Sequence, residues 1–293
     1  MPFDTRQPLS IQAARTINVG RGSGGGVVGN TPVERQFIID INGDGGTVGG
    51  PVANSTGILD GKQVFTGTAG GTTYSNEMQY EGSNVLRMSV AEGSQGFGSL
   101  GGAVNLQNHQ DAQTYLYRGD EFWMKTRMYF PSGGWQWNEG RNKFFRARVF
   151  NPDGSSSYID LYIDGNRSTG TQIWWIYEGE NSWRSNGSAA PDVILFDQWH
   201  DIEMYCRLDS IPSDEGGMAH TRIWIDGDLI MDIGNRRTIN HPDSEIRNIG
   251  LFLYYGNEGA PSDLHLFADN YIFRTSLPSN TDAAGNPFIG ANS

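Results

Sequence analysis

An Asp-Gly turn between two alternating segments is the feature that most constrains the fold of this chain of 293 residues. In the segment 221–232, Ile223 and Ile225 come before the turn and Leu229 and Met231 come after it, each beside polar residues. Asp-Gly at the centre of such a pattern is the strongest short-range signal for a two-residue β-hairpin. The last third of the chain therefore predicts antiparallel sheet.

Segments of the same kind recur upstream. They alternate or run apolar over short stretches, and turns rich in Gly, Pro, Asn and Asp separate them. Helical segments long enough for a crossover connection are absent. Many short strands at close spacing predict an all-β fold, an antiparallel β-sandwich of the jelly-roll type. The upstream segments are 84–90, 122–130, 143–150, 158–164 and 172–177.

Glycines gather in the first third of the chain, where short β-prone pieces alternate with Gly-rich turns without a sustained period. We therefore expect residues 1–75 to form an extended Gly-rich N-terminal arm. Residues 76–275 are expected to form the jelly-roll domain, and residues 276–293 a C-terminal tail. An arm of this kind suits contact with neighbouring protein subunits, which are the protein partners we expect.

The formal net charge of -12 argues against a general nucleic-acid or anionic-membrane binder, since both require a basic footprint. Apolar runs of the ~18 residues that a membrane helix requires are absent. The start of the chain lacks the basic and apolar regions of a secretory signal. We expect a virion or another assembly made in the cytoplasm. The single cysteine, Cys206, is expected to be a buried inert thiol.

Four motifs in order carry a resemblance to a known family: Trp199-His-x-Ile-Glu, Thr221-x-Ile-Trp-Ile-Asp-Gly, Asn248-Ile-Gly-Leu-Phe-Leu and Phe267-Ala-Asp-Asn-Tyr-Ile. The order resembles the C-terminal half of the concanavalin A-like lectin/glucanase jelly rolls. It is most similar to their polysaccharide-lyase branch, related to alginate and glucuronan lyases. The resemblance covers about residues 76–275. It implies β-elimination on uronic-acid polymers over a concave sheet, with a basic residue on the carboxylate and a Tyr, His or Lys moving protons.

The matching positions form an incomplete catalytic set. Lys143 stands where one such branch carries a catalytic lysine, but the Leu-Pro-Gly that should follow it is absent. Ile159 occupies the place of an expected arginine on the next strand. The paired tyrosines of the last motif correspond to Trp175 and Tyr177, so one hydroxyl remains.

One strand predicts a polar, aromatic face. In the segment 158–164, alternation places Tyr158, Asp160 and Tyr162 together, opposite an isoleucine and leucine face. A face of this kind would suit the floor of a sugar-binding site. Tyr162 is the candidate for proton transfer if the protein is a lyase.

The neighbouring strand adds two arginines. Regular alternation over residues 143–150 groups Arg146 and Arg148 with Phe144 and Phe150. Arginine offers a planar fork to carboxylates, so this pair suits an acidic or hydroxyl-rich glycan. The alternative is cross-strand ion pairing with the carboxylate of the next strand and ordinary aromatic packing.

Aromatic residues in turns are further glycan-binding candidates, because their faces match the C–H surfaces of pyranose rings. The candidates are Trp135, Trp137 and Trp175, and the pair Tyr254 and Tyr255. Tryptophan also fills sandwich cores, so structural roles are the alternative.

Two further motifs are weaker. His109 lies in a polar loop and is the candidate base among the histidines, with simple solvent exposure as the alternative. Asp40, Asn42 and Asp44 match the first positions of a calcium loop, so Ca²⁺ is the one cofactor considered. Because Pro51 stands where a bidentate Glu belongs, a plain Gly-rich turn is the alternative.

Two functions remain open. We favour a non-catalytic jelly-roll subunit that recognises a polysaccharide or surface glycan, or that builds a larger assembly such as a phage particle. The alternative is a polysaccharide lyase that cleaves an acidic, uronate-containing polysaccharide by β-elimination. In that case the catalytic groups would be drawn from Lys143, Tyr162, Tyr177 and His109. Neither function requires a cofactor, and neither involves nucleic acid or a membrane.

Overall fold

The computed structural model describes most of the chain after residue 35. The described residues are strands, turns and loops, with no α-helix among them. Within them there is accordingly no helix long and apolar enough to cross a membrane. The described ranges are 36–52, 56–59, 62–97, 100–106, 114–137, 142–165, 172–177, 183–185, 194–209, 218–239, 241–256 and 258–290.

Sheet A contains eight of the strands that the structure describes, and all its pairings are antiparallel. Strand β1 (Ile38–Ile41) pairs with β17 beside the main path. The order along the main path is β15 (Asp228–Arg236), β14 (Ala219–Ile225), β13 (Trp199–Arg207), β8 (Glu121–Tyr129), β17 (Leu264–Arg274), β5 (Ser83–Val90) and β4 (Thr72–Tyr80).

Sheet B contains nine of the described strands and is also antiparallel. Strand β6 (Gly96–Phe97) pairs with β16 beside the main path. The order along the main path is β12 (Trp183–Ser185), β11 (Gln172–Tyr177), β10 (Ser156–Gly165), β9 (Asn142–Phe150), β16 (Glu245–Tyr255), β7 (Gly102–Asn105), β3 (Lys62–Gly67) and β2 (Thr56–Leu59).

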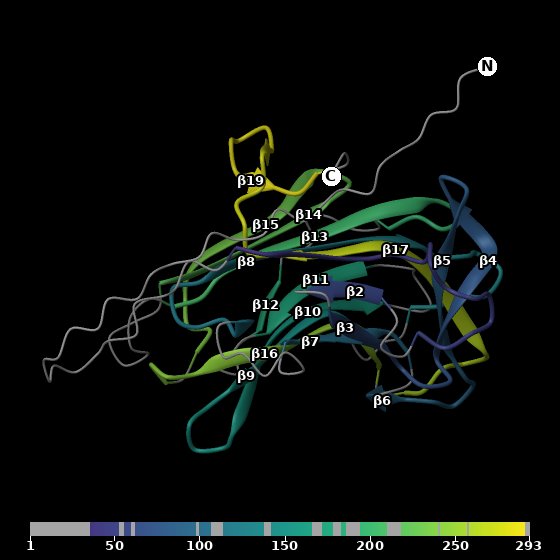
Figure 1. Ribbon diagram of the computed structural model, residues 1–293, viewed down its shortest axis with the longest axis horizontal. Helices are drawn as coiled ribbons and strands as arrows, with labels where there is room; N and C mark the ends of the chain where they lie inside the picture. Colours follow the sequence, from purple (N-terminus) through teal and green to yellow (C-terminus); the bar gives the residue numbers. More distant parts are fainter. Residues whose placement is uncertain are drawn as a thin grey trace, which may run out of the picture. The chain divides into compact units, whose positions relative to one another are not determined.

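The two sheets form two layers with the main core between them (Figure 1). Side chains from both sheets meet there: Phe145 of β9 stacks on Tyr271 of β17, with ring centroids 6.1 Å apart. On β10, Ile159, Leu161 and Ile163 all point into this core, as their alternation predicts. The predicted all-β antiparallel sandwich is confirmed.

The Asp-Gly hairpin also forms where the sequence predicts it. It joins β14 to β15, and Asp226 and Gly227 both have positive φ, at 52° and 88°. Two successive positive φ values are the mark of the type I′ turn, whose twist matches that of the strands it joins.

The structure places the start of the sandwich well before the expected boundary at residue 75. Strands β1, β2, β3 and the first part of β4 all lie in the two sheets, and Ile39 and Ile41 are fully buried. Gly43 explains how a glycine-rich segment packs so closely, because a Cβ atom there would lie 2.2 Å from the carbonyl oxygen of Asn84. Residues 1–35 of the expected arm lie outside the described residues.

Residues 276–290 of the expected tail are folded against sheet A. Strands β18 (Asn280–Thr281) and β19 (Pro287–Phe288) form a hairpin, which Figure 1 shows beside β14 and β15. It covers a second apolar cluster on the face of sheet A opposite the core, in which Phe288 packs on Trp224. The cluster consists of Trp123, Tyr205, Trp224, Ile272 and Ile289.

Glu203 of β13 anchors this C-terminal hairpin. Its carboxylate accepts hydrogen bonds from the backbone N–H groups of Ile289 and Gly290, and Lys125 donates to the carbonyl oxygen of Gly290. Burial raises the pKa of Glu203 to about 7, against the opposing effect of the two backbone hydrogen bonds.

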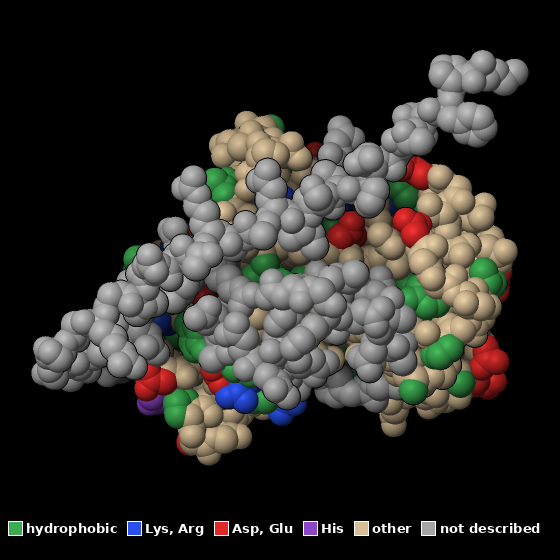
Figure 2. Space-filling view, viewed as in Figure 1, with side chains coloured by type: hydrophobic (Ala, Val, Ile, Leu, Met, Phe, Trp, Pro, Cys, Tyr) green, Lys and Arg blue, Asp and Glu red, His purple; other side chains and the backbone are tan. Residues whose placement is uncertain are grey.

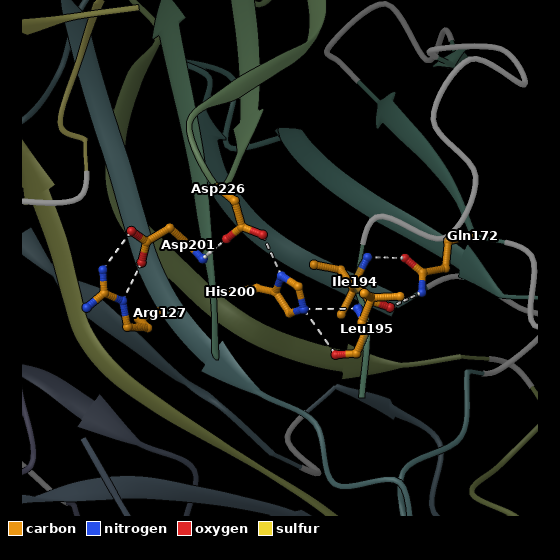
Figure 3. A network of polar contacts seen from close by, with 7 residues as sticks. All are labelled: Arg127, Gln172, Ile194, Leu195, His200, Asp201 and Asp226. Carbon is orange, nitrogen blue, oxygen red and sulfur yellow. Dashed lines mark hydrogen bonds and ion pairs between the residues drawn. The ribbon is translucent and has the colours of Figure 1, made fainter. Parts of the chain in front are cut away.

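A chain of polar contacts connects the two sheets at one edge (Figure 3). Gln172 of β11 exchanges two hydrogen bonds with the backbone of Ile194, at 2.7 and 3.1 Å. The next residue, Leu195, donates its N–H to Nε2 of His200 on β13, at 2.9 Å. Nε2 also lies 3.0 Å from the carbonyl oxygen of Leu195, and Nδ1 of His200 lies 2.6 Å from a carboxylate oxygen of Asp226.

The chain continues across the outer face of sheet A. The second carboxylate oxygen of Asp226 accepts a hydrogen bond from the backbone N–H of Asp201. The two carboxylate oxygens of Asp201 in turn accept hydrogen bonds from Nε and Nη2 of Arg127, at 2.5 and 2.7 Å. The hairpin turn at residue 226 is thus hydrogen-bonded to the start of β13.

Glu203 predicts a pH dependence of stability. Glutamate ionises near 4.5 in the unfolded chain and near 7 in the native state, so between these values the native state holds the extra proton. The stabilising contribution of that proton is complete below pH 4.5 and is lost as the pH rises through 7. Relative to Glu203→Gln, the wild-type protein should therefore lose up to about 3 kcal/mol of unfolding free energy across this range.

Chemical denaturation at a series of pH values measures this difference. The exposed Glu92 provides the control, since Glu92→Gln should leave the wild-type pH dependence unchanged. Parallel curves for the wild-type protein and Glu203→Gln would contradict the assignment.

Candidate functional site

A β-bulge in β9 determines which side chains share the outer face of sheet B, the face that points away from the core. Leu161 pairs with Phe145, but the next residue of β10, Tyr162, pairs with Lys143. The extra residue is Phe144, and it shifts the alternation of β9 by one position. Lys143 therefore lies on the same face as Arg146, although the two are separated by an odd number of positions.

An aromatic cluster holds the bulge. Phe144 and Phe145 are both fully buried, and Phe144 meets Phe252 of β16 edge to face at 4.8 Å. Phe252 lies at an irregularity of its own strand, with φ of 46°. Alternation predicted that Phe144 would share a face with the arginines; the bulge overturns that prediction and turns its ring into the core.

Trp135 and Trp137 belong to the same cluster. Their side chains are buried, and they pack against Phe130 with ring centroids 5.3 and 5.0 Å apart. Neither ring has a face open to a sugar, so the prediction that they bind glycan is corrected. Tyr255 is also buried and donates its hydroxyl to the backbone of Gln136. The loop that carries Trp135 and Trp137 is therefore packed against the core side of β9.

Lys143, Arg146 and Asp160 form a charged group on the outer face of sheet B. The lysine Nζ lies 3.6 Å from one carboxylate oxygen of Asp160, and Nε of Arg146 lies 3.4 Å from the other. Lys143 and Arg146 are 8% and 7% exposed, and Asp160 is completely buried. The cross-strand ion pairing that the sequence left as an alternative is therefore present.

Three tyrosines surround this charged group. The Arg146 guanidinium stacks on the ring of Tyr158, with its central carbon 3.4 Å from the ring centroid. The Lys143 ammonium lies 5.2 Å from the centroid of Tyr162 and 4.6 Å from that of Tyr254. Cations near aromatic faces are attracted to the ring quadrupole. The rings thus hold the cations in place and add hydroxyl groups beside them.

The environment of Asp160 has opposing effects on its pKa. Complete burial raises the pKa above the ordinary value, whereas Arg146, Lys143 and the Tyr162 hydroxyl favour the ionised form. A buried carboxylate between two cations is costly to create and holds its partners tightly once formed.

A second bulge lies farther along the same face, where Ile246 and Asn248 of β16 pair with consecutive residues of β9. The extra residue, Arg247, projects outward, and its guanidinium carbon lies 5.2 Å from the ring centroid of Phe150. Arg148 lies 4.7 Å from the same ring. Arg148 is exposed, so basic side chains continue beyond the buried charged group.

Three sequence candidates have no described side chain. The backbones of Trp175 and Tyr177 are described, and they pair with Tyr162 and Asp160 respectively. This register places both on the strand next to the charged group. His109 lies outside the described residues. Their proposed roles stay predictions.

The candidate calcium loop begins within β1, which contains Asp40. The backbone N–H of Asp44 donates to the side chain of Asn42, and that of Gly43 donates to Asp269. Burial and the neighbouring charge of Asp44 raise the pKa of Asp40. Within the ranges that the structure describes, no three His, Cys, Asp or Glu side chains gather to form a metal site. Calcium binding at this loop stays a prediction.

The sequence did not predict the position of two outer-face residues, Tyr254 and Arg247. Tyr254 was grouped with Tyr255, but strand alternation places the first on the outer face and the second in the core. Arg247 was not considered at all. The adjacent phenylalanines 144 and 145 are the signal that could have revealed the first bulge, because two neighbouring core residues break strand alternation.

The fold is shared with known polysaccharide lyases. A variant of alginate lyase Aly36B in complex with an alginate trisaccharide superposes with a TM-score of 0.57 at 15% identity, over 82% of this chain and 98% of that chain. Alginate lyase vAL-1 from Chlorella virus gives 0.52 at 11% identity, over 70% and 89%. No protein-family model and no curated protein matches the sequence. At these identities the likeness shows the fold alone, an antiparallel β-sandwich that this chain shares with the two alginate lyases.

The charged group predicts a large effect of Asp160→Asn. The substitution leaves two mostly buried cations without the carboxylate between them, and breaking a buried ion pair costs about 3 to 5 kcal/mol. Chemical denaturation at neutral pH measures the loss. The exposed Asp228 gives the matched control, since Asp228→Asn should change stability by less than about 0.5 kcal/mol. A loss below about 1 kcal/mol for Asp160→Asn would contradict the ionic role of this residue.

Proposed function

We propose that this protein binds a uronate-containing polysaccharide on the outer face of sheet B and cleaves it by β-elimination. The observation that carries the proposal is the bulge in β9, which places Lys143 beside Arg146 on one face, among three tyrosines. Cations for a carboxylate and phenols for proton transfer are the groups that this reaction requires.

Arg146 is suited to hold the carboxylate of the sugar. Its guanidinium is fixed from one side by the Tyr158 ring and from another by Asp160, so it is positioned before a ligand arrives. Neutralising the uronate makes the hydrogen on the adjacent carbon, C5, easier to remove, because negative charge then develops toward a paired carboxylate. Arginine binds carboxylates more specifically than lysine because of its planar fork.

Tyr162 is suited to move the proton. Its ring lies beside the Lys143 ammonium, which stabilises negative charge that develops on the phenol oxygen during the transfer. In the proposed step a base removes the C5 proton, the electron pair forms the C4–C5 double bond, and the bond from C4 to the glycosidic oxygen breaks. That oxygen receives a proton and leaves as a hydroxyl. Tyr254, on the other side of Lys143, is the second phenol available.

The fold is consistent with this proposal. Sandwiches of the same architecture, those of Aly36B and vAL-1, are alginate lyases, and the former is seen with an alginate oligosaccharide. The outer face of sheet B also carries basic side chains in a protein whose net charge is -12, which favours an acidic glycan over a neutral one.

A non-catalytic glycan-binding or structural subunit is the second candidate. The observation that favours it is the low exposure of Lys143 and Arg146, which are both paired with Asp160. An ion-paired group of this kind also serves simply to specify the packing of a sheet. Subunit contacts through the N-terminal arm, as in a phage particle, belong to this second proposal.

The two candidate functions differ in whether an unsaturated uronate is formed. Incubation with alginate, glucuronan and related polymers, followed by ultraviolet absorbance, detects the unsaturated uronate that β-elimination creates. We expect turnover by the wild-type protein and a loss of about 100- to 10,000-fold in Tyr162→Phe, the range for removing a general acid or base. Tyr129→Phe, which removes a half-exposed hydroxyl from sheet A, should retain full activity.

Binding of a uronate polymer without any unsaturated product would decide for the second candidate. Turnover in Tyr162→Phe equal to that of the wild-type protein would refute the role given to Tyr162. Neither binding nor turnover with any uronate polymer would reject both glycan proposals.

A further inference from the structure

The outer face of sheet B has a second cationic group beyond the proposed reaction centre. Arg148 and Arg247 approach the same ring, that of Phe150, at 4.7 and 5.2 Å. Their guanidinium carbons therefore lie no farther apart than the sum of these two distances. Tyr115 adds a second ring, 5.0 Å from Arg247. Two like charges held this close repel each other, and a bound anion relieves that repulsion.

The hydrogen-bonding capacity of both arginines is underused. In the part of the chain that the structure describes, Arg148 makes no ion pair, and its one side-chain hydrogen bond is a long one, 3.5 Å to Ser156. Arg247 pairs with Glu245 through one terminal nitrogen, while its Nε is buried and has no hydrogen-bond partner among the described residues. The Arg247 side chain as a whole is nevertheless 37% exposed, so its guanidinium can be reached by an acceptor from solution.

The bulge at residue 247 creates this pair. Ile246 points into the core and Asn248 lies opposite Arg148 on the outer face, so the extra residue between them is also turned outward. Without the bulge, residues 247 and 248 would point to opposite faces of the sheet. Bulges of this kind occur where a strand must aim a side chain at a site.

The second group is aligned with the first. Arg146 and Arg148 are two positions apart on β9, which separates them by about 7 Å along the strand. Tyr158, whose ring supports Arg146, is the register partner of Arg148. Figure 2 shows Lys and Arg side chains gathered at the edge where Figure 1 places β9 and β16. The basic side chains therefore form a track along β9.

We infer that Arg148 and Arg247 form a second carboxylate subsite, so that the protein takes glycans with uronates at neighbouring positions and aligns them along β9. The inference rests on the proposed function and adds its substrate class: blocks of consecutive uronates rather than isolated ones. The rings of Phe150 and Tyr115 would contact the apolar face of the sugar at this subsite, beside the guanidinium groups.

The test is the dependence of affinity on glycan length. Titration calorimetry with a series of alginate oligosaccharides, from disaccharide to hexasaccharide, compares the wild-type protein with Arg148→Gln/Arg247→Gln. We expect the affinity of the wild-type protein to rise with length. The double variant should bind the disaccharide with the affinity of the wild-type protein. Its affinity for the longer oligosaccharides should fall about tenfold or more, since each substitution removes a charge-assisted hydrogen bond.

Controls separate this subsite from folding and from general charge. Arg222→Gln changes an arginine of sheet A that is paired with Asp232, and it should leave the length dependence intact. The thermal unfolding midpoint of the double variant should equal that of the wild-type protein. Neutral oligosaccharides of matched length should show no gain from the two arginines.

Three outcomes would overturn the inference. An unchanged length dependence in the double variant, together with lost binding in Arg146→Gln, would reject the second subsite and leave the proposed function in place. Oligonucleotides of matched length that bind as tightly as the uronates would show a general polyanion track. No binding of any uronate oligosaccharide to the wild-type protein would reject the proposed function and the subsite together.

Discussion

The packing of Phe144 against Phe252 is the contact on which the outer face of sheet B depends. These two rings lie at adjacent irregularities of β9 and β16 and fill the core there. Trp135 packs on Phe252, and Trp137 packs on Phe144. A bulged residue leaves the hydrogen-bond ladder locally incomplete, and burial of a large ring offsets that loss. The polar arrangement on one side of the sheet is therefore stabilised by apolar packing on the other.

The charges on that face illustrate why burial and function are hard to separate. Asp160 has no exposure, yet it holds two cations that would otherwise repel each other. Such a carboxylate both maintains the sheet and positions side chains for an incoming anion. Arg148 differs in this respect, because it is solvent-exposed and lies against an aromatic ring instead of a carboxylate.

Local patterns were enough for the fold and not for the site. The Asp-Gly hairpin and the alternation of β10 depend on neighbouring residues, and both are found as predicted. The faces of Phe144 and Arg247 depend on register between β9 and distant strands, which periodicity within one segment does not contain. The burial of Trp135 likewise depends on partners far away in sequence. Strand β1 falls among the short β-prone pieces of the expected arm, but its place in sheet A depends on pairing with β17, which local sequence does not contain.

The pairing of β1 with β17 has a consequence for the route by which the chain folds. It joins residues 38–41 to residues 271–274, so one of the first described strands finds its place only after nearly all the others exist. Closing such a long loop costs conformational entropy before the contact contributes any stabilising free energy. Folds dominated by pairings of this kind therefore assemble slowly. During synthesis on the ribosome, the exposed edge of β1 would wait for β17, and this waiting period is when self-association competes with folding.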